Sequence, residues 1–161
     1  MTEDQRAQRV LALNIFFLAV IIIVVLIVAV RAQENPSVQG VSGALTILST
    51  FAQVSATIAG FLIVGLIFLI QSRATKGEPL VLMSMYDIIF FGAATVVFSL
   101  TTINATDGLR YVASQTLVDF RTTDFLRWTL ALMWAGYVLA TAGFSVLVVN
   151  YKDRMKKIRL R

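Results

Sequence analysis

The stretch VLALNIFFLAVIIIVVLIVAV, residues 10–30, decides the fold class of this chain. Asn14 is the one strongly polar residue in it, and no charged residue interrupts the run. An α-helix rises about 1.5 Å per residue, so about 20 apolar residues cross a hydrocarbon core of about 30 Å. The stretch therefore predicts a transmembrane helix. Because it is apolar on every side, we expect it to be the most lipid-exposed helix of the chain.

Three more apolar runs follow, at residues 45–70, 80–103 and 125–150. Of the 161 residues, 58% are hydrophobic and 14% are charged, whereas soluble domains have about 45–50% and about 25%. The runs are continuous and do not alternate, which excludes a membrane β-barrel. The sequence predicts an all-α integral membrane protein with a single domain, 1–161, in which four transmembrane helices form a bundle.

Lys and Arg are distributed unevenly around these spans. Ten of them lie on the side that holds the N-terminus, the second connection and the C-terminus, and four lie on the other side, namely Arg31, Arg110, Arg121 and Arg127. Cytoplasmic segments of membrane proteins carry the excess of Lys and Arg. We therefore expect a multi-pass protein with both termini in the cytoplasm.

The basic tail, residues 151–161, concentrates this charge. Its basic residues are Lys152, Arg154, Lys156, Lys157, Arg159 and Arg161. Near an anionic membrane surface each contributes about 1 kcal/mol of attraction, so we expect them to contact anionic lipid; anchoring of the topology alone is the simpler explanation. No aromatic platform or folded domain accompanies the charge, and nucleic acid is not an expected partner.

The third connection, residues 104–124, has an amphipathic pattern. Leu109, Val112, Leu117 and Phe120 can share one helical face. This pattern predicts a short helix that lies on the outer membrane surface or caps the bundle, with a docking surface for a partner as the alternative. Thr123-Asp124 is then expected to form the N-cap of the fourth helix.

Small residues recur on the second and fourth spans at intervals of three or four. Small side chains let helix backbones approach closely in lipid. We therefore predict helix-packing positions at Ala52, Ala56, Gly60, Gly136, Ala140 and Gly143. The spacing does not show whether the small residues of the second span contact those of the fourth span.

Polar residues suggest a second use for the same helices. Gln53 and Thr57 are one turn apart on the second span, and Asp87 is the one acidic residue inside any of the four spans. Such groups either hold neighbouring helices together or line a polar pathway. For Asp87 the two alternatives are an interfacial carboxylate paired with Arg73 or Lys76, and a proton or cation site.

Residues 55–64, Ser-Ala-x-x-Ala-Gly-Phe-x-x-Val, are similar to the pore-helix core of the Orai calcium-channel family, whose members also have four spans. The similarity covers about ten residues. Phe68 stands where that family has its filter carboxylate, and the matching helix here runs inward. We interpret the similarity as convergence on small-residue packing, and no functional residue is carried over from it.

The composition argues against catalysis. Without His or Cys, the chain cannot by itself hold haem, an iron–sulfur cluster, copper or a typical zinc ion, so no cofactor is expected. It also has no paired-carboxylate, Gly-rich or nucleophile-elbow pattern, which predicts that it is not an enzyme. The sequence favours a non-catalytic accessory subunit that packs into a larger membrane assembly or a homo-oligomer. The alternative is a homo-oligomeric ion channel or small transporter whose pathway follows the second and third spans.

Overall fold

The computed structural model describes residues 3–31, 33, 38, 40–74 and 85–159, and it describes side chains for 8, 10–31, 33, 38, 40–71 and 85–149. These residues form four α-helices and no strand. The helices are α1 (Glu3–Arg31), α2 (Gly40–Ala74), α3 (Tyr86–Val112) and α4 (Phe120–Arg159). Each is long and apolar enough to cross a membrane, which confirms the predicted all-helical, multi-pass architecture.

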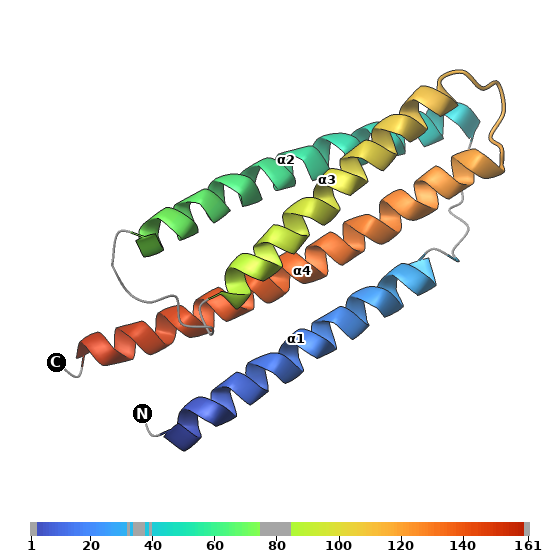
Figure 1. Ribbon diagram of the computed structural model, residues 1–161. Coiled ribbons are helices and arrows are strands. Elements are labelled where there is room, and N and C mark those ends of the chain that lie inside the picture. The colour runs from blue at the N-terminus through green and yellow to red at the C-terminus, as the bar shows by residue number, and fades with distance from the viewer. Residues whose placement is uncertain (1–2, 32, 34–37, 39, 75–84, 160–161) are drawn as a thin grey trace.

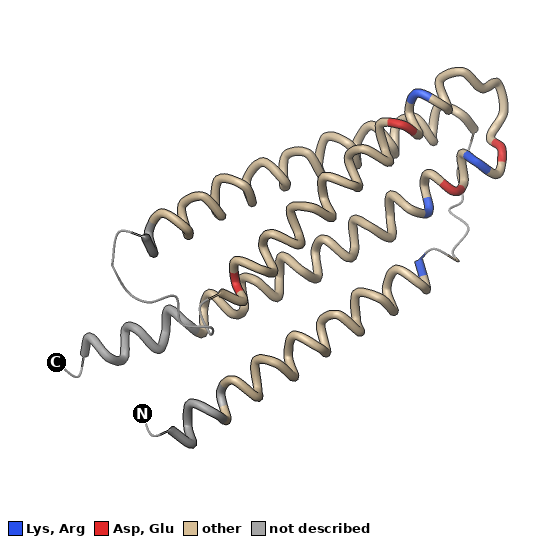
Figure 2. The backbone as a smooth tube through the Cα atoms, viewed as in Figure 1, with Lys and Arg blue, Asp and Glu red and all other residues tan. Residues whose placement is uncertain are grey.

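The helices form one bundle in which α3 lies between α2 and α4, while α1 lies along α4 (Figure 1). Because the helices alternate in direction, the N- and C-terminal ends lie at the same end of the bundle (Figure 1). Figure 2 shows the described acidic and basic residues near helix ends, with an uncharged region between them. This distribution suits a bilayer, because charge in the hydrocarbon core is costly.

The core follows the buried side of α3. Its buried residues recur at intervals of three and four, which is the spacing of one helix face. They include Phe90, Ala94, Phe98, Thr101, Ala105, Gly108 and Val112. The phenylalanines belong to one apolar cluster with α2 and α4, and Ala105 and Val112 belong to a second cluster with Leu48 of α2 and Leu126 of α4.

Glycines let α3 and α4 come close together. A Cβ atom added at Gly136 would lie 2.9 Å from the ring of Phe98, and one added at Gly143 would lie 3.2 Å from the ring of Phe91. Gly108 of α3 is equally tight, since its Cβ would lie 2.9 Å from Cβ of Phe125. A Cβ atom at Gly108 or Gly136 would force its neighbours to move, and one at Gly143 would be tightly packed. The rings of Phe91 and Phe98 on α3 therefore pack directly on the backbone of α4.

The prediction of a separate amphipathic helix in the third connection is wrong. Leu109 and Val112 belong to the last turns of α3, Phe120 begins α4, and residues 113–119 form a turn. Leu117 and Phe120 are 78% and 73% exposed, so they do not share a packed face with Val112, which is buried. The pattern arose because both helices continue well past the spans expected from hydropathy.

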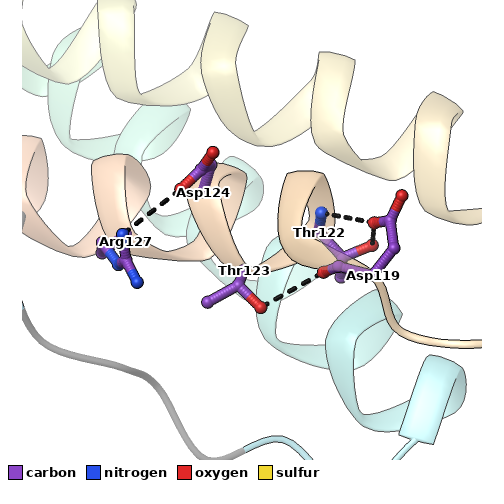
Figure 3. Close-up of polar contacts among 5 residues, drawn as sticks. All are labelled: Asp119, Thr122, Thr123, Asp124 and Arg127. Carbon is purple, nitrogen blue, oxygen red and sulfur yellow. Dashed lines mark hydrogen bonds and ion pairs between the residues drawn. The ribbon is translucent and has the colours of Figure 1, made fainter.

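The N-cap of α4 is also four residues earlier than predicted. The Asp119 side-chain carboxylate accepts hydrogen bonds from the backbone N–H of Thr122 at 2.8 Å and from its hydroxyl at 2.9 Å (Figure 3). An N-cap side chain bonds to the N–H three residues later, so Asp119 caps a helix that begins at Phe120. Thr123 and Asp124 lie inside the first turns, where Asp124 pairs with Arg127 at 3.3 Å (Figure 3).

Candidate functional site

Two opposite faces of α2 differ in what they contact. The inner face packs on α3 through Leu48, Ser55, Ala59 and Leu62, all of which are buried. The Ser55 hydroxyl lies 2.8 Å from the Thr102 hydroxyl of α3 and forms a hydrogen bond with it. Successive residues are about 100° apart around a helix, so Gln53, two positions from Ser55, lies on the opposite side.

That opposite side carries a continuous row of residues, which we call the outer seam. They are separated by alternating steps of four and three, and all eight are exposed. The outer seam comprises Thr46, Thr50, Gln53, Thr57, Gly60, Val64, Ile67 and Gln71. Over these 26 positions it is about 38 Å long, which is enough to cross the hydrocarbon core.

Gln53 is the unusual member of the outer seam. The hydroxyls of Thr46, Thr50 and Thr57 donate to backbone carbonyls one turn earlier, at 2.8–2.9 Å. The Gln53 side-chain amide is exposed and has no hydrogen bond to any described residue. It lies within about 4 Å, along the helix, of the midpoint of the apolar span Gly40–Gln71. In a bilayer, an amide at this depth faces hydrocarbon unless another molecule covers it.

The residues beside Gln53 are small. Ala56 and Gly60 are exposed, and a Cβ atom added at Gly60 would meet nothing within 4 Å. Ala52 is half-buried and packs against the cluster around Leu48. The α4 positions differ, because Gly136 and Gly143 are buried against α3 and Ala140 packs beside them. The two sets of small residues therefore do not meet each other.

Asp87 is separated from Gln53 and Thr57. It is fully buried in the first turn of α3, where its carboxylate accepts a hydrogen bond from the backbone N–H of Ile88 at 2.8 Å. The N-terminal turn of a helix favours negative charge. The proposed partners Arg73 and Lys76 lie outside the described side chains. Within one molecule, the structure does not bring the three residues of the predicted polar pathway together.

The prediction missed two polar links between helices. The Tyr86 hydroxyl of α3 donates to the Asn14 side-chain oxygen of α1 at 2.5 Å. The Asn104 amide of α3 donates to the Phe125 carbonyl and to the Thr129 hydroxyl of α4, at 3.0 and 2.9 Å. The sequence did contain a signal for each link, namely an asparagine (Asn14 or Asn104) in or beside an apolar span. A side-chain amide at such a depth needs a hydrogen-bond partner.

At the C-terminal end of α3, side-chain hydrogen bonds link this helix, the turn at residues 113–119 and the start of α4. The Tyr111 hydroxyl donates to the Asp119 carboxylate, and the Arg121 guanidinium lies 6.0 Å from the Tyr111 ring. The hydrogen bonds from Tyr111 and from the backbone of Thr122 hold the pKa of Asp119 below its ordinary value of 3.8. Tyr111 and Arg121 also line an open hollow of about 240 Å³ with Trp128. Through these bonds Asp119 links the last turn of α3 to the first turn of α4.

The six basic tail residues remain a prediction. The backbone of α4 continues to Arg159, but the side chains of Lys152, Arg154, Lys156, Lys157, Arg159 and Arg161 lie outside the described residues. Among the described residues, no group of His, Cys, Asp or Glu is suited to hold a metal ion. In comparisons with known proteins, no family, curated protein or solved structure matches this chain.

Proposed function

We propose that this chain is a non-catalytic multi-pass membrane subunit that assembles with other transmembrane helices through the outer seam of α2. Its termini lie in the cytoplasm, in accord with the ten Lys and Arg residues on that side against four on the other. The chain then acts by holding an assembly together. Anionic lipid at the basic tail is a further proposed contact.

The exposed amide of Gln53 carries this proposal. A polar group without a hydrogen bond in hydrocarbon costs several kcal/mol. The amide has no partner in the described part of its own chain. A neighbouring helix that packs on Ala56 and Gly60 would cover the amide and offer it a partner. Close approach is possible there because these two residues are small and uncovered.

The mass of the purified protein tests the proposal. In a mild detergent and in lipid nanodiscs, we expect particles clearly heavier than the 17.7 kDa chain, and Ala56→Leu should return them to the monomer mass. Thr141→Leu is a matched control, because Thr141 is an exposed residue of α4 whose hydroxyl already bonds to the Tyr137 carbonyl at 2.7 Å. A wild-type chain that is monomeric in both environments contradicts the proposal.

The outer seam also favours a second candidate, a homo-oligomeric channel. Its first four residues, Thr46, Thr50, Gln53 and Thr57, are all polar, and a ring of α2 helices would turn them toward a central path. Further along, Val64 and Ile67 would form an apolar constriction of the kind that gates by dewetting. Ion flux from liposomes that Gln53→Leu alters would favour the channel. Flux equal to that of empty liposomes would contradict the channel, and the assembly subunit would then remain the proposed function.

A further inference from the structure

We infer that the partner of the outer seam is a second copy of this chain, in a parallel two-fold dimer in which α2 packs on α2 and Gln53 bonds to Gln53. This inference rests on the proposed function and names the partner at the same face. It follows from the spacing, the orientation and the hydrogen-bonding chemistry of the seam.

The spacing of the outer seam is that of a two-stranded helix contact. Steps of four and three average 3.5 residues, and two helices with such rows pack along their length at a crossing angle of about 20°. Thr50, Thr57 and Val64, at every second position, are β-branched. These three residues occupy one of the two core positions of such a contact. The other core position holds Thr46, Gln53, Gly60 and Ile67.

Orientation brings identical residues together. Two copies of one chain insert into a membrane with the same topology, so their α2 helices run parallel. Around a two-fold axis along the membrane normal, each residue near the axis faces its own copy. Gln53 then faces Gln53 at one depth in the bilayer, and Gly60 faces Gly60 one heptad further along.

The Gln53 amide suits a partner identical to itself. A primary amide carries both donors and an acceptor, so two facing amides can form two reciprocal hydrogen bonds. Facing carboxylates or ammonium groups would repel each other, but the eight outer-seam residues are uncharged. An unlike partner would need an amide or hydroxyl at this one depth, whereas a second copy supplies it by symmetry. Ala56 beside the amide lets the two backbones approach closely enough.

Disulfide cross-linking of single-cysteine variants tests the geometry, because the natural chain has no cysteine. In liposomes with an added oxidant, we expect Thr46→Cys, Thr50→Cys, Thr57→Cys, Gly60→Cys and Val64→Cys to give a species of twice the chain mass. Gly65→Cys and Ile70→Cys are matched controls on exposed positions about 110° around the helix from the seam, and these should stay monomeric. Equal cross-linking at seam and control positions, or none at the seam, overturns the inference. Cross-linking confined to the middle of α2 also overturns it, since that result indicates antiparallel copies.

A dilution series in liposomes tests the amide pair. At about 0.6 kcal/mol per hydrogen bond in a membrane, losing two bonds through Gln53→Leu weakens dimerisation about sevenfold. Gln53→Asn keeps an amide on the same face and should retain more of the affinity than Gln53→Leu. Unchanged dimerisation in Gln53→Leu overturns the inference.

The same measurements separate failure of the inference from failure of the proposed function. If the seam cysteines give no dimer, but the chain forms a complex of unlike chains that Ala56→Leu dissociates, the second copy is wrong and the assembly role stands. If the chain is monomeric with no complex of either kind, both are wrong.

Discussion

The outer faces of α1 and α2 have the same geometry and different chemistry. On α1, Leu11, Ile15, Leu18, Ile22 and Val25 are separated by alternating steps of four and three and are each 50–61% exposed. The outer seam of α2 has the same spacing and is also exposed from end to end. Its residues, however, are Thr, Gln, Gly, Val and Ile, where α1 has large aliphatic side chains.

Under the proposed assembly, two equally exposed faces have different neighbours, lipid at α1 and protein at α2. Large aliphatic side chains are as apolar as lipid tails, so lipid alone can cover the α1 face without leaving a polar group unbonded. The two helices also differ in what their amides bond to. Both are exposed, but the Asn14 side chain of α1 accepts a hydrogen bond from Tyr86, whereas the Gln53 side chain of α2 has no hydrogen bond to a described residue. We therefore interpret the α1 face as a surface for lipid and the α2 face as a surface for protein.

The largest effect is expected from adding the same bulk to both faces. Ala56→Leu on α2 should weaken association by about 3 kcal/mol, roughly 100-fold, because the added side chain holds the paired backbones apart. Ala19→Leu places the same change on an exposed position of α1 and should have no effect. Dimer fraction against protein-to-lipid ratio measures both. An equal loss in the two variants would remove the distinction between the faces.

The glycines allow the same comparison between an outward and an inward position. Gly136→Ala should destabilise the fold by about 2 kcal/mol, because the new Cβ meets the ring of Phe98, which is fully buried. Gly60→Ala should leave the monomer unchanged or stabilise it by up to about 1 kcal/mol through helix propensity, since nothing lies within 4 Å of its Cβ. Unfolding in mixed micelles with increasing SDS measures both variants.

This prediction has a clear opposite outcome. If Gly60→Ala unfolds as easily as Gly136→Ala in a monomeric preparation, then Gly60 is packed within the chain. The outer seam would then not be an open surface.

The two amides are expected to affect different properties. Asn14→Leu removes the bond from Tyr86 and should lower the free energy of unfolding by about 1 kcal/mol, while association stays unchanged. Gln53→Leu should show the reverse, with weakened association and a monomer of unchanged or greater stability. SDS unfolding and the liposome dilution series measure the two properties separately. Tyr86→Phe is the control for Asn14→Leu, because it removes the same bond from the other side.

The smallest effect is expected from pH. Since the pKa of folded Asp119 is below the ordinary 3.8, its contribution to stability is present above about pH 4 and is lost as the pH falls further. Asp119→Asn keeps an oxygen to cap α4 and should make unfolding less sensitive to pH between about 2.5 and 5. Association should not change in this range, because the outer-seam residues carry no titratable group. Acid-dependent dissociation of the wild-type dimer would contradict this.

Part of the candidate site was predictable from residue spacing. Small side chains four apart drew attention to Ala56 and Gly60, and Gln53 and Thr57 stood out as polar residues in an apolar span. The direction of these residues was not predictable, because Ser55 and Gln53 are both plausible polar contacts and the choice between them depends on where α3 packs. The buried position of Gly136 likewise depends on Phe98, which is distant in sequence.

The sequence by itself determined that the chain has four membrane-spanning helices, because runs of about 20 apolar residues have a stable place only in lipid. It also placed the excess of positive charge at one side of the membrane. Only the tertiary structure decided which face of each helix is used within the bundle. In the structure Ser55 faces Thr102 and Gln53 faces outward. The rings of α3 pack against the glycines of α4, and α3 leads into the turn before α4 without a separate helix between them. Hydropathy is a property of each segment, whereas the choice of a packing face depends on the shapes of helices far apart in the sequence.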